Sequence, residues 1–144
     1  MTIGKIPNEG ETLIANLIFK NADVNRGTNL QLVLFTNSAF TDTATYASLT
    51  EPSTGGYARK TLTDGSWSIT ADTGTGTVGA VASYAVQTFT PSGASWAGVY
   101  GAAIVTTGTT PKILAFVIDP NAPITVPDGI AYNVTPSIPV GRLS

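Results

Sequence analysis

Residues 112–119 of the chain read Lys-Ile-Leu-Ala-Phe-Val-Ile-Asp, an apolar run with one charged residue at each end. The apolar side chains occupy consecutive positions, so both faces of this stretch are hydrophobic, as in a strand that lies between two layers. Its length and its content of Ile, Phe and Val also favour a strand. We expect these residues to form a strand at the centre of the core, with Phe116 as a core residue.

Neighbouring segments carry strand patterns of their own. Residues 130–138 place Ile130, Tyr132, Val134, Pro136 and Ile138 at every second position, which indicates a strand with one buried face. Pro136 has no N–H to donate and predicts an edge or a bulge. Further strands are expected at residues 30–36, 57–63, 66–70, 84–90 and 97–106. The Asp64-Gly65 dipeptide between two of them predicts a hairpin.

One segment has the pattern of a helix. Residues 8–20 place Leu13, Ile14, Leu17 and Ile18 on one stripe, with Asn8 available as N-cap. Glu9 and Glu11 fall in the first turn, where acidic side chains complement the helix dipole. Residues 1–7 precede the helix as an arm, and residues 38–56 read as a long surface loop.

The pattern of elements predicts the fold class. Roughly seven or eight short strands, with turn signals about every 8–12 residues, are typical of an all-β sandwich or jelly roll. We expect residues 1–144 to form a single mainly β domain, an antiparallel β-sandwich with one N-terminal helix and its strands within residues 30–144. Trp67 and Tyr132 fall on the apolar phase of their strands, so both are expected in the core.

Composition excludes several classes of partner. Charged residues make up 11% of the 144, against about a quarter in ordinary soluble proteins. Seven basic and nine acidic residues give a net charge of −2, which leaves no electrostatic footprint for nucleic acid. No apolar run approaches the roughly 20 residues that span a bilayer, so no membrane contact is expected. We expect a chain that folds in the cytosol, with a neutral, hydroxyl-rich surface suited to packed arrays.

The same sequence offers little for catalysis. It has no cysteine and no histidine, so a thiolate zinc site and a Ser-His triad around Ser95 are both excluded. Residues 74–79 match G-x-G-x-x-G, but no acidic residue follows at the spacing that a dinucleotide site needs. Asp64, Asp72, Asp119 and Asp128 lie beside turn-forming residues. We expect no enzyme activity, no cofactor and no metal site.

At this point the chain resembles a group of small tailed-phage virion proteins, described as structural, decoration or tail-fibre-like. The most specific stretch is Glu51-Pro-Ser-Thr-Gly-Gly-Tyr-Ala58, followed by Leu62-Thr63 and Trp67. The similarity continues through further segments over nearly the whole chain, namely residues 7–11, 32–37, 87–90, 99–101, 113–115 and 130–138. The resemblance implies a virion component and does not separate capsid from tail.

Physical arguments favour the capsid. Fibres need elongated repeats or coiled-coil stalks, and this chain has neither. We expect a capsid decoration (cement) protein on the virion surface, assembled in the host cytoplasm, that binds the major capsid protein and itself as a homotrimer. The arm supplies the interface candidates Thr2, Ile3 and Ile6, and residues 1–7 are expected to become ordered on binding.

Two alternatives remain at this stage. A tail or head appendage would bind a host glycan or an adaptor protein through residues 38–56, where Phe40 and Tyr46 are the aromatic side chains. Trp96 is a further stacking candidate, because its exposure does not follow from the sequence. A hydrolase or lyase lacks titratable groups in a recognisable arrangement.

Overall fold

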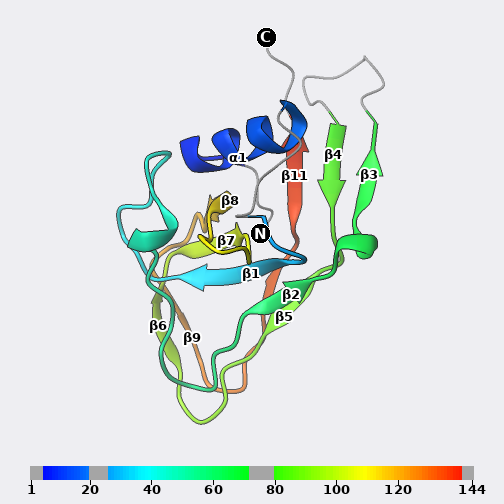
Figure 1. Cartoon of the computed structure of the whole chain (residues 1–144). Coiled ribbons are helices and arrows are strands. Elements are labelled where there is room, and N and C mark those ends of the chain that lie inside the picture. Colours follow the sequence, from blue (N-terminus) through cyan, green and yellow to red (C-terminus); the bar gives the residue numbers. More distant parts are fainter. Residues whose placement is uncertain (1–4, 20–25, 72–79, 141–144) are drawn as a thin grey trace.

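A computed structural model describes residues 5–19, 26–71 and 80–140. Within these residues the protein is mainly β, with several antiparallel sheets and one α-helix, which confirms the mainly β class (Figure 1). The described helices include none that could span a bilayer. In chain order the elements are α1 (Asn8–Phe19), β1 (Leu30–Phe35), the 3-10 helix η1 (Tyr46–Ser48), β2 (Lys60–Leu62), the 3-10 helix η2 (Asp64–Ser66), β3 (Ser68–Thr70), β4 (Ala80–Ser83), β5 (Gln87–Phe89), β6 (Trp96–Val99), β7 (Gly101–Val105), β8 (Ile113–Ile118), β9 (Ile124–Val126), β10 (Tyr132–Val134) and β11 (Ser137–Val140).

The largest sheet has four antiparallel strands in the order β2-β1-β7-β8. Strands β1 and β7 occupy its middle, with Leu32 opposite Ile104. Because successive side chains of a strand point to opposite faces, β1 supplies two separate clusters. Leu32 and Leu34 belong to the larger cluster, and Val33 and Phe35 belong to the smaller one. This sheet is therefore buried on both faces.

Strand β8 confirms the strand expected at residues 112–119, and its buried side chains belong to both core clusters, although β8 is the last strand of the sheet. Segments near the N-terminal end of the chain cover it. The helix α1 packs against it, and Lys5 pairs with Phe116 through backbone hydrogen bonds of 3.1 and 2.8 Å. Gly10 lets the helix come this close, since a Cβ there would overlap the carbonyl oxygen of Leu114.

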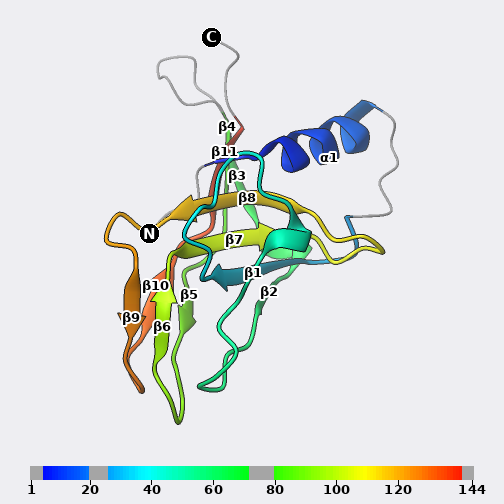
Figure 2. The same ribbon diagram turned by 90° about the vertical axis from the view of Figure 1, so that its left-hand side faces the viewer.

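Other elements cover the two faces of the four-stranded sheet. The two-stranded sheets β10-β5 and β6-β9 lie below it in Figure 2 and supply Phe89, Val99 and Val134 to the larger cluster. The opposite face is covered from the predicted loop, where the ring of Phe40 stacks on Phe35 with centroids 4.1 Å apart. The loop thus lies against the body and fills part of the core.

The predicted hairpin around Asp64-Gly65 is wrong. Strand β2 pairs with β1 of the four-stranded sheet, whereas β3 pairs with β4 in a separate sheet of order β11-β4-β3. The turn η2 carries the chain from one sheet to the other. Arg26 forms an ion pair with Asp64 at 2.7 Å, and the Asp64 N–H donates to the side-chain oxygen of Asn29. These contacts with distant residues fix the turn in a form that does not fold β3 back on β2.

Two expected strands are each divided. The segment 130–138 gives β10, which pairs with β5, and β11, which pairs with β4. Pro136 lies between them, as expected from its missing N–H. The segment 97–106 gives β6 and β7, which separate at Tyr100 and join different sheets. Each of these two segments therefore contributes strands to two different sheets.

Candidate functional site

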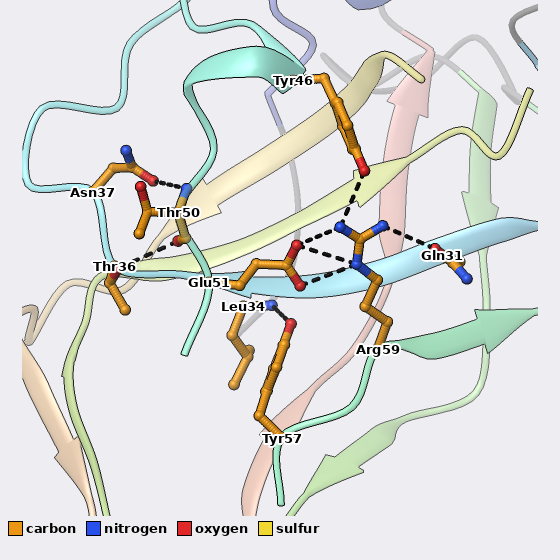
Figure 3. Close-up of polar contacts among 9 residues, drawn as sticks. All are labelled: Gln31, Leu34, Thr36, Asn37, Tyr46, Thr50, Glu51, Tyr57 and Arg59. Atoms are coloured by element: carbon orange, nitrogen blue, oxygen red, sulfur yellow. Dashed lines mark hydrogen bonds and ion pairs between the residues drawn. The ribbon is translucent and has the colours of Figure 1, made fainter. Parts of the chain in front are cut away.

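The largest polar cluster centres on the guanidinium of Arg59. Its Nε donates to both carboxylate oxygens of Glu51 at 3.1 Å, and Nη2 donates to the Glu51 carboxylate and, at 3.0 Å, to the hydroxyl of Tyr46. Nη1 donates to the side-chain oxygen of Gln31 on β1 at 3.2 Å. Figure 3 shows these side chains converging from β1, η1 and the chain between η1 and β2. Several hydrogen bonds between the planar guanidinium and the carboxylate fix the relative orientation of the two side chains.

Electrostatics hold this cluster in its charged form. Desolvation by burial lowers the pKa of Arg59, but hydrogen bonds to Glu51 and Tyr46 outweigh it, and the net shift raises the pKa above its usual value. The guanidinium therefore keeps its proton and cannot act as an acid or a base in this site. Its hydrogen bonds connect three segments of the chain.

Tyr57 completes the edge of β1. Its hydroxyl accepts a hydrogen bond of 2.8 Å from the backbone N–H of Leu34, beyond the last residue that β2 pairs (Figure 3). Burial raises the pKa of Tyr57 above its usual range, with the negative charge of Glu51 adding to the effect. The neutral hydroxyl thus replaces a missing strand partner for a buried N–H.

Gly55 and Trp96 form the other end of the same stretch. Trp96 is 2% exposed, and its indole N–H donates to the carbonyl oxygen of Thr54 at 2.8 Å. Gly55 has a φ of 59°, and a Cβ there would overlap the carbonyl oxygen of Ala94. The contacts of the stretch from Glu51 to Tyr57 therefore stabilise the fold. This stretch is part of the segment on which the resemblance is most specific.

Glu9 has a role that sequence reasoning missed. Its Oε2 accepts hydrogen bonds from the backbone N–H groups of Tyr46 at 3.1 Å and Ile113 at 2.7 Å, and Oε1 pairs with Lys112 at 3.2 Å. The side chain of Glu9 thus joins α1, η1 and β8. The first-turn pattern indicated a partner for the helix dipole, whereas the contacts that the structure adds come from outside the helix.

Of the four aspartates expected at turns, Asp64, Asp119 and Asp128 lie there and each also contacts a distant segment, whereas Asp72 lies outside the described residues. Asp119 is buried and accepts hydrogen bonds from the Tyr132 hydroxyl at 2.8 Å and the Asn121 N–H at 2.9 Å. Burial raises the pKa of Tyr132, and the bond to Asp119 adds to the rise. Asp128 accepts from the Gly93 N–H. Among the described residues, no group of three or more acidic side chains could hold a metal ion.

The predicted core residues differ in burial. Phe116 is 1% exposed and belongs to the smaller cluster. Trp67 and Tyr132 are half-buried and pack against the larger cluster, where Trp67 also meets the ring of Tyr84 edge-on. The indole nitrogen of Trp67 is the buried side-chain polar atom that has no hydrogen-bond partner within the described ranges.

Of the predicted interface residues, Ile6 alone lies in the part of the chain that the structure describes. Thr2 and Ile3 lie outside the described residues. Ile6 packs against the larger core cluster, and Lys5 is already paired with β8. The expectation that residues 1–7 become ordered only on binding therefore does not hold for residues 5–7.

The aromatic side chains considered for glycan stacking are also occupied. Phe40 is buried under η1 and its flanking loop, and the hydroxyl of Tyr46 accepts from Arg59. A polar pocket of about 340 Å³ lies beside this loop, lined by Thr36, Thr50, Glu51, Pro52, Ser53, Thr54, Ser95, Trp96 and Ala97. Because Trp96 is almost fully buried, its ring offers no open face for a sugar in this pocket.

Comparison of the chain with protein-family models, with curated proteins and with solved structures finds no match.

A second concave region is apolar. It lies between α1 and the sheet β11-β4-β3, as two adjoining pockets of about 200 and 170 Å³. We call it the apolar groove and define it by its lining residues, Leu13, Ile14, Leu17, Arg26, Leu30, Trp67, Ala82, Leu114 and Ile138. Among the described residues, the exposed large apolar side chains are those of Phe19, Ile69, Val86, Ile118 and Ile130. The geometry thus supplies surfaces for binding and leaves most charged groups engaged within the fold.

Proposed function

We propose that this protein is a non-enzymatic structural component of a tailed-phage virion, and specifically a capsid decoration protein. The observation that carries the proposal is the use of its charged residues. The carboxylates of Glu9, Glu51 and Asp119 accept hydrogen bonds from distant parts of the chain, as structural braces do. The apolar groove remains for contact with other proteins.

We propose that the protein acts by adding buried contact area between subunits of the capsid. A specific protein–protein contact buries about 800 Å² on each partner, and apolar area contributes about 25 cal/mol per Å² before the costs of association. Several copies that bind one shell and one another gain avidity, which suits a homotrimer on the local symmetry axes of a capsid. The protein would then raise the barrier to rupture of the filled shell. We also propose that its sheets belong to the sandwich or jelly-roll class, which suits a compact block.

The appendage reading has less support. It needs an exposed recognition surface on residues 38–56, and the two aromatic side chains there are used inside the molecule. The polar pocket beside Glu51 is the place on this loop where a glycan would have to bind, and its carboxylate is already held by Arg59. An adaptor protein contacting hydroxyl-rich surface is the remaining form of this alternative.

The deciding experiment measures binding of the purified protein to mature capsids and, separately, to purified tails, by co-sedimentation and electron microscopy. Saturable binding to capsids at a fixed ratio to the major capsid protein is the expected result. Binding to tails or host cells alone overturns the capsid proposal. Ile3→Asp tests the arm, and Ile130→Asp is its control, because Ile130 is exposed in a turn distant in sequence from the arm. We expect only Ile3→Asp to weaken capsid binding.

A further inference from the structure

Strand β3 is the outer strand of its sheet. Among the described residues it pairs with β4 on one side and with no strand on the other, and Figure 1 shows it at the outside of the molecule. All three of its residues are exposed. An outer strand presents a row of unpaired N–H and C=O groups that can pair with another strand.

Apart from its short length of three residues, this edge lacks the features that usually prevent such pairing. Natural edge strands are protected by a charged side chain, a proline or a bulge. Residues 68–70 read Ser-Ile-Thr, and their pairing with β4 runs in register without a bulge. In the sequence from Gly65 to Pro111, Asp72 is the only charged residue. Residues 68–70 themselves therefore present no charge to an approaching strand.

The apolar face of the sheet continues onto this edge. Ile69 lies opposite Ala82, and Ala82 lies opposite Ile138, so the three side chains form one row on one face. Ile138 is 6% exposed and Ile69 is 70% exposed. Ala82 and Ile138 also line the apolar groove. The row is thus covered at its inner end by the body of the protein and open at its outer end.

We propose that β3 pairs antiparallel with β3 of a second copy of this chain, about a two-fold axis at Ile69. A second copy fits because an uncharged edge meets an identical uncharged edge without repulsion, whereas a charged partner would find no complement there. The two-fold axis keeps the same face of both sheets on the same side. It joins two three-stranded sheets into one of six strands and continues the row of Ile69, Ala82 and Ile138 across the contact.

This contact is separate from the homotrimer and from capsid binding. It is two-fold, and two-fold axes relate neighbouring three-fold sites on an icosahedral shell. It is tested on the purified full-length chain alone, so its failure and the failure of the capsid proposal are distinguishable.

The sharpest test is cross-linking through Ile69→Cys. The chain has no cysteine, so each variant carries a single thiol. Residues directly opposite in an antiparallel pair have Cα atoms about 4.5–5.5 Å apart, which a disulfide can bridge. The matched control is Val86→Cys, which is exposed and lies outside every described strand. We expect a disulfide-linked dimer at least about tenfold faster from Ile69→Cys than from Val86→Cys, because pairing raises the local thiol concentration. Equal rates overturn the proposal.

A second measurement needs no cysteine. Sedimentation at increasing concentration is expected to show self-association of the unaltered chain that Ile69→Lys weakens at least tenfold, since two lysines would then face each other. Val86→Lys is expected to leave it unchanged. A two-fold association step, from monomer to dimer or from trimer to hexamer, that persists fully in Ile69→Lys overturns the proposal, as does an unaltered chain whose β3 amides gain no protection from hydrogen exchange with concentration. Circular dichroism verifies that both variants fold.

Discussion

The hydroxyl of Tyr57 accepts a hydrogen bond of 2.8 Å from the backbone N–H of Leu34, just beyond the last residue of β1 that β2 pairs. Leu34 is fully buried in the larger core cluster, so its N–H has no access to water. A side chain thus completes the hydrogen bonding of a strand that its neighbour is too short to cover.

Replacing this hydroxyl is expected to cost stability. Tyr57→Phe leaves the N–H of Leu34 buried and unpaired, which lowers the free energy of unfolding by about 1–3 kcal/mol. Urea denaturation measures the change. Tyr100→Phe is the control, because the Tyr100 hydroxyl makes no hydrogen bond to any described residue, and it should change stability by less than about 0.5 kcal/mol. Equal losses in both variants would contradict this role for Tyr57.

Alkaline pH is expected to destabilise the protein. Burial raises the pKa of Tyr57 and Tyr132 above the ordinary tyrosine value of about 10. The folded state therefore retains protons that the unfolded chain releases, so the stabilisation is complete below about pH 10 and is lost as the pH rises further. Unfolding free energies measured between about pH 8 and about pH 11 should fall only in the upper part of that range.

Tyrosine absorbance checks the same shifts in the folded protein. A hydrogen bond from the backbone N–H of Thr63 lowers the pKa of Tyr84, so Tyr84 is expected to ionise early. Tyr57 and Tyr132 should ionise only when the protein unfolds. A single titration in which all five tyrosines ionise together before unfolding would contradict the burial of these two hydroxyls.

Glu9→Gln tests the joint between α1, η1 and β8. The glutamine amide keeps one acceptor oxygen, but it loses the charge that strengthens the hydrogen bonds from Tyr46 and Ile113. The other carboxylate oxygen is replaced by an NH2 group, which can only donate. We expect a loss of about 1.5–3 kcal/mol in thermal or urea unfolding. Glu11→Gln, an exposed first-turn neighbour, should cost less than about 0.5 kcal/mol. A similar loss from both would assign the effect to the helix dipole.

Gly55→Ala tests the close approach under Trp96. The glycine has a φ of 59°, and Gly93, with a φ of 86°, is the matched control because a Cβ there would meet open space. Gly93→Ala should cost about 1–2 kcal/mol for the left-handed backbone alone. Gly55→Ala should cost about 1–3 kcal/mol more, since its Cβ overlaps the carbonyl oxygen of Ala94. Equal costs would show that Ala94 moves aside freely.

The sequence predicted the elements better than their partners. Local patterns were sufficient for α1, β1 and β8, because helix stripes and apolar runs reflect burial of the segment itself. They could not show that β2 and β3 enter different sheets, since the alternation of Leu62 and Trp67 is the same in a hairpin and in a crossover. The place of residues 112–119 at the end of the sheet was not predictable either, because an apolar run does not say whether a strand or a helix covers it.

For the residues of the candidate site, too, the sequence did not predict which distant residues they contact. Glu9 bonds to N–H groups 37 and 104 positions away, and no local signal reports such contacts. The sequence singled out the stretch from Glu51 to Ala58, but it did not show that this stretch forms hydrogen bonds with Arg59, Leu34 and Trp96. The exposure of Ile69 depends on which strand ends the sheet, which is a property of topology.

The carboxylate of Glu9 has a consequence for synthesis of the chain. A ribosome releases Glu9 early, but the Ile113 N–H that it accepts from emerges more than a hundred residues later. Until then α1 has no β8 to pack on, and Lys5 has no Phe116 to pair with. A product truncated before Ile113 cannot close this joint and stays open to proteolysis. The N-terminal end therefore closes only after residue 113 has been synthesised.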